Sequence, residues 1–581
     1  MSSYKAPVDE IDFALRTWAK LPALLNPSAI PDSCDAETIS AVLNGAGRFA
    51  AEVLAPLDVV GHRDGCELRP DGSVRTPNGW KDAYAQFVAA EWNTVNFPAH
   101  VGGQGLPSPV AIAVAEMFEG ANLAFSLALM PFAGVVALLD RFGTDDQKGR
   151  YLAPLVSGRW SATLAMTESH AGTDIGALRM SASPLTNGFG LRGQKVFISY
   201  GAHDLNENIL HFVLARDPAG RPGAKGLSLY LVPKRLVNPD GSLGELNDVR
   251  CIAVERKMGI HGSPTTTLVF GAKDSAWGER LGDPCKGLDH MFVVLNRARL
   301  NIGVFGLASA ERAWQIANAY ANERVQGLDA AGRPCVIARH PDVRRMLLEM
   351  QTGVDAMRAV CYYAAGLLER SQRDDAPEKQ HQWRRRLDLL TPVVKGWVTE
   401  FAYETAGTGV QVAGGAGYMD ESPASRCLLE ARVHTIYEGT TGVQAMDLTL
   451  RKVAKDGGKA AAELLDEMGS IWPIAARAAR LDGNLADIKD ALSMLAAATD
   501  WIVGHAASKP AAVQAVGVHY LMMWGYALGA WLMTTAAQEQ PARAARANFF
   551  LRHRLPRVQM HWRVIEHGAD AAADGLVQDS S

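Results

Sequence analysis

The chain has 581 residues, of which 62 are acidic and 58 are basic, so its net charge at pH 7 is −4. This near balance excludes a protein that overall charge draws to nucleic acid or to an anionic membrane, and we expect no nucleic-acid partner. Because 48% of its residues are hydrophobic, a chain of this length is expected to form roughly three to five structural units with large cores.

The cysteines and the beginning of the sequence indicate the cellular compartment in which the protein is expected. Seven cysteines are spread along the chain with no C-x-x-C pair. We therefore expect reduced thiols, and neither a disulfide framework nor a metal site. The first residues, Met1–Glu10, have no apolar core like that of a signal peptide, which predicts a cytoplasmic protein.

The N-terminal part, residues 1–160, is predicted to be a helical domain. Apolar residues recur at spacings of three and four in Ala36–Val53 and Val110–Leu139. Between them, Asn96–Gly105 contains proline and three glycines, which predict a loop. That loop is either a simple connector or a place where a ligand approaches the backbone.

Residues 161–285 change from helical spacing to alternation and predict a central β module. This order of helical, β and helical parts indicates an α+β fold with a barrel-like or sandwich-like module between helical regions. No G-x-G-x-x-G motif follows a strand and opens a helix, which argues against a Rossmann domain with a nicotinamide cofactor. The predicted strands are Phe189–Arg192, Lys195–Ser199, Asn208–Leu214, Leu227–Val232, Cys251–Arg256 and Thr265–Phe270.

Residues 286–450 return to helical spacing and predict a bundle of long antiparallel helices, in the manner of a four-helix bundle. A glycine-rich turn, Ala413–Tyr418, stands between the third and the fourth helix. Such a turn suits either the close approach of a large planar or phosphorylated ligand or a tight connection between helices. The predicted helices are Met291–Val325, Pro341–Arg370, Leu390–Val412 and Ser425–Leu450.

The segment Val433–Gly442 holds the strongest catalytic candidate, Glu438. A carboxylate beside Ile436 and Tyr437 could be desolvated and become a useful base. Gly439 would let a substrate lie against the backbone, so that amide groups could hold a developing enolate oxygen. On this pattern alone, a helix C-cap with a solvated Glu438 is the alternative.

Five ordered segments together resemble the signature segments of acyl-CoA dehydrogenases. The resemblance runs in register from about Ala51 to Leu450. Within this family the chain is most similar to the long bacterial branch that includes 3-methylmercaptopropionyl-CoA dehydrogenases, partly because helical sequence continues after residue 450. The five segments are Leu164–Asp174, Lys195–Ser199, Arg324, Gln411–Tyr418 and Tyr437–Gly442.

The resemblance implies a role for each matching position. FAD would lie between the β module and the helical bundle, with no metal ion. Glu438 would be the catalytic base, and the substrate would contact Arg299, Tyr437 and Gly439. FAD would be bound by residues from two subunits. The implied FAD contacts are Met166, Thr167, Gly172, Thr173, Phe197, Ser199 and Thr440 in one subunit, with Arg324, Gln411, Gly414 and Gly415 from its neighbour.

The implied reaction is the α,β-dehydrogenation of an acyl-CoA to a trans-2-enoyl-CoA, with flavin N5 as the hydride acceptor. Short or medium acyl-CoAs, including 3-(methylthio)propanoyl-CoA, are the expected substrates. The expected partners are an electron-transfer flavoprotein as electron acceptor and further copies of this chain, as a dimer or a dimer of dimers. Two alternatives stay open: an acyl-CoA oxidase that uses oxygen, and a flavoprotein scaffold reused to bind nucleic acid or membrane.

Residues 451–581 are expected to form an additional helical extension. Pro510–Gln538 contains no Asp, Glu, Lys or Arg and is long enough for a membrane span, but a helix buried on several sides gives the same pattern. We expect the buried helix. The basic run Arg543–Arg563 is expected to be the solvated face of a last helix, with a nucleic-acid or membrane patch as the alternative. The predicted helices are Ala460–Met468, Leu485–Val503, Ala511–Ala537 and Arg543–Arg563.

Overall fold

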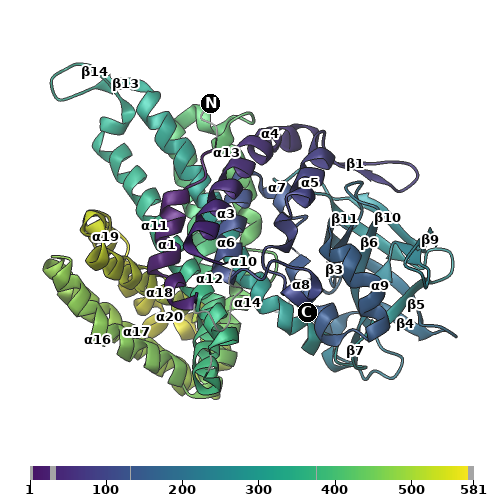
Figure 1. Ribbon diagram of the computed structural model, residues 1–581. Helices are drawn as coiled ribbons and strands as arrows, with labels where there is room; N and C mark the ends of the chain where they lie inside the picture. The colour runs from purple at the N-terminus through teal and green to yellow at the C-terminus, as the bar shows by residue number, and fades with distance from the viewer. Residues whose placement is uncertain (1–3, 26–33, 131, 375, 574–581) are drawn as a thin grey trace, which may run out of the picture.

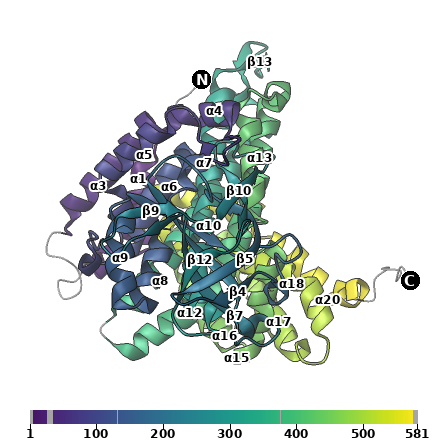
Figure 2. The same ribbon diagram turned by 90° about the vertical axis from the view of Figure 1, so that its right-hand side faces the viewer.

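The computed structural model describes residues 4–25, 34–130, 132–374 and 376–573 (Figure 1). The start of the predicted N-terminal domain (1–3), position 131 of the predicted helix 110–139 and the end of the extension (574–581) lie outside these residues. The β module lies on one side of the long helices, and in Figure 1 the extension lies on the lower left. Figure 2 views the molecule with the β module in front of the helices. This arrangement confirms the α+β fold.

The N-terminal helices pack around α6, which is buried along most of its length. The predicted helix 36–53 is α3 followed by the π-helical turn η1 (Ala50–Leu54). The predicted helix 110–139 is wrong as one element, because Asn122 has an extended backbone and caps α7 by accepting from the Phe125 N–H. The helices are α1 (Val8–Thr17), α2 (Leu21–Leu24), α3 (Ala36–Phe49), α4 (Ala55–Asp64), α5 (Trp80–Ala89), α6 (Ser108–Ala121), α7 (Leu123–Ser126), α8 (Phe132–Phe142) and α9 (Asp145–Val156).

The β module is built on a mostly antiparallel sheet in the order β10-β11-β5-β12-β7-β6-β3, with β4 beside β5. Two predicted strands are one long strand, because the chain passes Gly193 without leaving the sheet. The sequence analysis missed β3, a continuous buried run that pairs in parallel with β6. The strands are β3 (Trp160–Ala165), β4 (Ser181–Pro184), β5 (Phe189–Ser199), β6 (Asn208–Arg216), β7 (Leu227–Pro233), β10 (Val249–Val254), β11 (Thr265–Phe270) and β12 (Ala276–Leu281).

Smaller strand pairs lie outside this sheet. They are β1 (Glu67–Leu68) with β2 (Val74–Arg75), β8 (Arg235–Val237) with β9 (Leu243–Leu246), and β13 (Val325–Leu328) with β14 (Pro334–Val336). In Figure 1 the β13–β14 hairpin projects from the end of the bundle that is remote from the β module.

Three long helices, α10 (Gly287–Glu323), α11 (Pro341–Arg373) and α12 (Pro377–Ala413), form the centre of the molecule. The predicted third helix began at Leu390, but α12 starts at Pro377, since proline fits the first turn of a helix. The predicted helix Ser425–Leu450 is wrong as a continuous element. It is α13 (Pro423–His434), a turn that contains Glu438, α14 (Thr441–Met446) and the π-helix η8 (Asp447–Val453).

The extension packs against this bundle mainly through α18, which is buried over most of its length. A Cβ atom on Gly525 of α18 would lie only 1.9 Å from Trp397 of α12, so the two helices are in close contact. The expected buried helix is confirmed. In the part of the chain that the structure describes, we find no helix with the length and apolarity needed to cross a membrane. The helices of the extension are α15 (Ala454–Asp456), α16 (Lys459–Ala478), α17 (Leu485–His505), α18 (Pro510–Glu539), α19 (Ala544–His553) and α20 (Arg557–Ala573).

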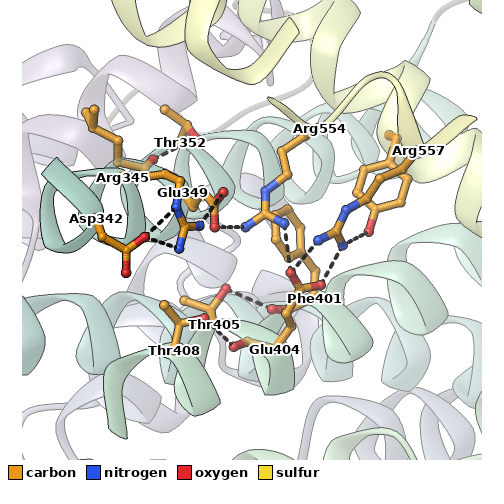
Figure 3. Close-up of polar contacts among 12 residues, drawn as sticks. Asp342, Arg345, Glu349, Thr352, Phe401, Glu404, Thr405, Thr408, Arg554 and Arg557 are labelled. Atoms are coloured by element: carbon orange, nitrogen blue, oxygen red, sulfur yellow. Dashed lines mark hydrogen bonds and ion pairs between the residues drawn. The ribbon is translucent and has the colours of Figure 1, made fainter. Parts of the chain in front are cut away.

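The basic run near the C-terminus is not one solvated helix face, as the sequence had indicated. Figure 3 shows Arg554 and Arg557 turned toward carboxylates of the central bundle. Arg554 contacts Glu349 of α11 and Glu404 of α12 at 3.2 and 2.7 Å, and Arg557 contacts Glu404 at 2.7 Å. The two arginines therefore hold the extension to the bundle.

Candidate functional site

The turn between α13 and α14 brings Glu438 into the interior. Glu438 has φ = 54° and Gly439 has φ = 95°, so the chain reverses through two successive left-handed positions. A left-handed glutamate is uncommon and carries backbone strain. No acceptor among the described residues takes up the backbone N–H of Glu438 or Gly439. The turn thus presents two amide donors beside a carboxylate.

One oxygen of the Glu438 carboxylate is shielded from water and unpaired, although Glu438 as a whole is half-buried. Its Oε2 atom is buried and has no hydrogen-bond partner among the described residues. Burial raises the pKa of Glu438, while the charges of Arg299 and Lys395 oppose the rise. A carboxylate with a raised pKa is a stronger base than a solvated one, so the C-cap alternative with a solvated Glu438 does not describe this residue.

Two cations adjoin the carboxylate from neighbouring helices. Arg299 of α10 forms a 3.0 Å ion pair with Asp447, at the start of η8. Lys395 of α12 is fully buried, and its Nζ atom has no partner among the described residues. Burial lowers the pKa of Lys395 to about 8, with Glu438 and Glu400 opposing that shift. Lys395 was not predicted as a site residue, since its one signal in the sequence is a charge on an otherwise apolar face of the helix.

A hydrogen-bonded chain fixes the other side of the turn. The ring of His434 contacts the Ser309 hydroxyl at 3.0 Å and the Tyr437 hydroxyl at 2.8 Å. Burial lowers the pKa of His434 to about 3, so its imidazole is neutral at physiological pH. Thr440 caps α14, since its side chain accepts from the Val443 N–H. These contacts give the turn between α13 and α14 a fixed frame.

A second group of predicted residues lies at one edge of the β module. The Thr167 carbonyl accepts from the Val196 N–H of β5, and the Met166 carbonyl accepts from Lys195 Nζ at 2.8 Å. Lys195 also forms a buried 2.8 Å ion pair with Glu168. Burial opposes ionisation of Glu168, but Lys195 and two backbone N–H groups hold its pKa below the usual value. This buried pair fixes the loop that continues to Gly172 and Thr173.

Phe197 and Ser199 extend the same edge. Phe197 has φ = 61° at a β-bulge between β5 and β11, and its side chain is 63% exposed. A bulge redirects a side chain out of its place in the strand, which accounts for an aromatic ring on the surface here. Ser199 pairs with Thr265 at the end of β5 and is half-buried. The predicted contacts to the reactive half of FAD are therefore grouped together.

The remaining predicted contacts lie elsewhere on the chain. Arg324 is exposed at the end of α10, just before the β13–β14 hairpin. Gln411, Gly414 and Gly415 are exposed at the end of α12, and a Cβ on either glycine would meet no atom within 4 Å. Figure 1 shows the β13–β14 hairpin and β5 on different sides of the molecule. One chain therefore does not bring these two groups together.

The residues present fit FAD. The loop at Met166–Thr173 and the exposed Phe197 ring offer backbone polar groups and an aromatic face, which suit a planar ring system. The open space beside Gly414 and Gly415 leaves their backbone accessible to a ligand.

A cavity lies between α6 and α10 on the Tyr437 side of the site. Its volume, counted as the space in which the centre of a water molecule fits, is about 130 Å³. Phe305 lines it, and the ring centroids of Phe305 and His434 lie 6.1 Å apart. Glu119 also lines it, and burial, followed by the charge of Glu116, raises the pKa of Glu119 well above the usual range. By the same measure one water needs ~10–15 Å³, so a short acyl chain fits here.

Comparisons with known proteins agree with this geometry. Residues 37–159 match the family model "Acyl-CoA dehydrogenase, N-terminal domain", and residues 286–452 match "Acyl-CoA dehydrogenase, C-terminal domain". Residues 461–575 match "Acetyl-CoA dehydrogenase C-terminal like". The chain belongs to the acyl-CoA dehydrogenase family, whose members are FAD-dependent oxidoreductases.

Individual relatives cover almost the whole chain. It is 37% identical to the 3-methylmercaptopropionyl-CoA dehydrogenase of Ruegeria pomeroyi, over 94% of this chain and 93% of that protein. It is 31% identical to the broad-specificity linear acyl-CoA dehydrogenase FadE5 of Mycobacterium tuberculosis, over 97% of this chain and 98% of that protein. The predicted long bacterial branch is thereby confirmed.

Solved structures share the fold. A structure of Caenorhabditis elegans ACDH-11 in complex with C11-CoA superposes with a TM-score of 0.76 at 19% identity, over 99% of this chain and 92% of that one. A Bacillus anthracis acyl-CoA dehydrogenase complexed with FAD superposes with a TM-score of 0.74 at 20% identity, over 94% of this chain and 92% of that one.

Proposed function

We propose that Glu438 is the base of this FAD-dependent acyl-CoA dehydrogenase and that it removes the α-proton of the acyl thioester. The observation that carries the proposal is the buried Glu438 carboxylate, whose Oε2 atom lacks a partner within the described protein. Such an oxygen can accept a proton at once, because no hydrogen bond to it must first be broken. FAD, when bound, supplies the acceptor for the hydride that leaves the β-carbon.

The backbone of the same turn activates the thioester. The N–H groups of Glu438 and Gly439 are the donors available to a thioester carbonyl, which gains negative charge as the α-proton leaves. Gly439 suits close approach because it has no side chain; a Cβ there would already lie 2.7 Å from Gln444. Tyr437, fixed by His434, would border the acyl group and exclude water.

The two cations beside Glu438 would set the strength of its carboxylate as a base. Arg299 and Lys395 favour the ionised carboxylate, whereas burial disfavours it. The net effect is a pKa above that of a free glutamate, so the carboxylate is the more basic of the two. Arg299, held by Asp447, would act on the substrate chiefly through Glu438.

The acyl group would enter the cavity between α6 and α10. The limited volume favours short or medium acyl-CoAs, and 3-(methylthio)propanoyl-CoA is one candidate because the Ruegeria pomeroyi relative carries that name. The electron acceptor would be an external protein, an electron-transfer flavoprotein, as the family resemblance implies.

A homo-oligomer follows from the separation of the two groups of FAD residues. Arg324, Gln411, Gly414 and Gly415 would complete the cofactor site of a neighbouring copy, in a dimer or a dimer of dimers. We place this assembly in the cytoplasm. Light scattering of the FAD-replete enzyme tests it: an active monomer contradicts the shared site.

The test of the catalytic role is Glu438→Gln, with exposed Glu421→Gln as the matched control. Anaerobic mixing with a panel of acyl-CoAs is followed by flavin bleaching. We expect Glu438→Gln to retain FAD and to lose on the order of 10³-fold in turnover. Comparable rates in both variants would exclude Glu438 as the base. Reoxidation by oxygen as fast as by the carrier flavoprotein would instead indicate an oxidase.

A further inference from the structure

The cavity between α6 and α10 contains an unusual amount of unsatisfied polarity. Four residues that line it carry a buried polar atom with no hydrogen-bond partner among the described residues. Buried polar atoms are nearly always paired, so their concentration around one cavity indicates a place for a polar group. These atoms are Trp92 Nε1, Asn93 Oδ1, Asn96 Oδ1 and Glu119 Oε2.

Arg297 adds a positive charge to the same cavity. It lines the cavity from α10, one turn before Asn301, which also lines it. Among the residues whose side chains the structure describes, none forms an ion pair with Arg297. A guanidinium stays charged even when burial lowers its pKa, as it does here. A half-buried cation without a partner is costly unless an anion compensates it.

The nearby carboxyl groups do not serve as that anion. Glu369, the carboxylate whose charge acts on Arg297, already accepts from the Ser108 N–H at 2.8 Å and pairs with Arg373 at 2.7 Å. Glu119 is not among the charges that act on Arg297, and burial and then the charge of Glu116 raise its pKa well above the usual range, which favours its neutral form. The positive charge of Arg297 is thus available to a ligand.

The chemistry of the lining selects the ligand class. A guanidinium offers paired N–H donors that match a carboxylate, and a protonated Glu119 and the Trp92 indole are further donors. The apolar part of the lining, which includes Phe87, Phe118 and Phe305, suits methylene groups. An acyl group that combines methylenes with a carboxylate matches both.

We propose that Arg297 is a specificity-determining residue that binds a carboxylate carried on the acyl group, so that a CoA thioester of a dicarboxylic acid is preferred over a neutral thioester of the same chain length. This inference rests on the proposed function, because it assumes that the acyl group of the substrate enters this cavity. The reaction is unchanged: the α-proton goes to Glu438, the β-hydride goes to the acceptor, and the distal carboxylate takes no chemical part.

The experiment measures binding apart from turnover. In the Glu438→Gln background, calorimetry gives Kd for glutaryl-, adipoyl- and suberoyl-CoA and for their neutral counterparts pentanoyl-, hexanoyl- and octanoyl-CoA. Arg297→Met is compared with Arg297→Lys, and Arg141→Met, on the exposed surface of α8, is the control for the same exchange. FAD content and circular dichroism identify a variant that fails to fold, in which case Arg297→Lys supplies the comparison.

We expect Arg297→Met to weaken the best-fitting dicarboxylyl-CoA by about 10- to 100-fold, as for a lost charge-assisted hydrogen bond, and to leave the neutral partner within about threefold. In the wild-type enzyme, kcat/KM should be higher for that dicarboxylyl-CoA than for its neutral counterpart. Equal losses for anionic and neutral thioesters would place Arg297 on the CoA moiety and overturn the proposal. A wild-type preference for every neutral thioester would also overturn it. Failure of the proposed function is distinct, because then no acyl-CoA bleaches the flavin.

Discussion

Nη1 of Arg554 lies 2.7 Å from Oε1 of Glu404, and this contact joins the turn between α19 and α20 to the C-terminal half of α12. Arg554 is 3% exposed although it is an arginine, because it lies under α19 and α20 against the central bundle. Its guanidinium also lies 5.0 Å from the Phe401 ring. The extension is therefore attached through a buried cation that has both ionic and aromatic partners.

Arg554→Met should lower the free energy of unfolding by about 1–3 kcal/mol. The loss should be below that of a fully enclosed ion pair, because Glu404 keeps access to water. Urea denaturation followed by circular dichroism measures it. Arg552→Met is the control, since Arg552 is exposed two residues earlier. Equal destabilisation by both variants would show that the Glu404 contact does not hold the extension.

The rate of flavin reduction should fall on the acid side of its pH profile with a midpoint above that of a free glutamate. Burial raises the pKa of Glu438, and only its ionised form removes a proton. Anaerobic stopped-flow measurements between pH 5 and about pH 9 give the midpoint in the complex. A midpoint near the ordinary value of a glutamate would indicate a solvated base.

Lys395→Met should move that acid limb to higher pH. The ammonium favours the ionised form of Glu438, so its removal raises the pKa of the carboxyl further. At pH 7 the variant should be slower, while at alkaline pH the rates should converge. Lys452→Met serves as control, because Lys452 is partly exposed and pairs with Asp388 at 3.7 Å. An unshifted profile would mean that Lys395 does not act on the base.

Glu438→Gln should make the protein more stable than wild type at pH 8, with a gain that disappears as the pH falls. The pKa of Glu438 is higher in the folded state than in the unfolded state, so its ionisation favours unfolding. The loss of stability caused by this ionisation is absent below the pKa that Glu438 has in the unfolded state. It is complete above the pKa that Glu438 has in the folded state. Thermal unfolding at several pH values, each compared with Glu421→Gln, measures the difference. A constant difference across pH would contradict burial of the charge.

Lys195→Met should reduce FAD retention while leaving the β module folded. It removes the 2.8 Å contacts that Lys195 makes with the Met166 carbonyl and the Glu168 carboxylate, so the loop at Met166–Thr173 loses its support. The ratio of flavin to protein absorbance after gel filtration gives FAD content, and circular dichroism reports the fold. Arg192→Met, at an exposed position on the same strand, is the control. Full retention of FAD by Lys195→Met would show that the loop supported by Lys195 does not contribute to FAD binding.

Regular, half-buried elements could be predicted from the sequence. The helix expected at Pro341–Arg370 is α11, which ends three residues later at Arg373, because one apolar stripe faces the core along its length. Strand β3 was missed because it is buried on both faces and shows no alternation. The break at Asn122 was missed because a single capping side chain interrupts otherwise helical spacing.

The candidate site divides in the same way. The segment around Glu438 could be found because its residues are consecutive and resemble a known family. Arg297, Lys395 and Glu119 could not, since a charge in a helix normally indicates a solvated face. Their burial depends on helices that are distant in sequence, and only the three-dimensional structure shows those contacts.

The close contact of Gly525 with Trp397 bears on how the protein is made. The face of α12 that receives α18 is synthesised well before α18 itself, so it stays exposed to water while the ribosome completes the chain. The dehydrogenase bundle therefore cannot finish its folding as an N-terminal unit during translation. A chaperone that binds apolar segments would find its target in this interval. A stop codon between α14 and α18 would yield a fragment with an exposed apolar face instead of a smaller enzyme.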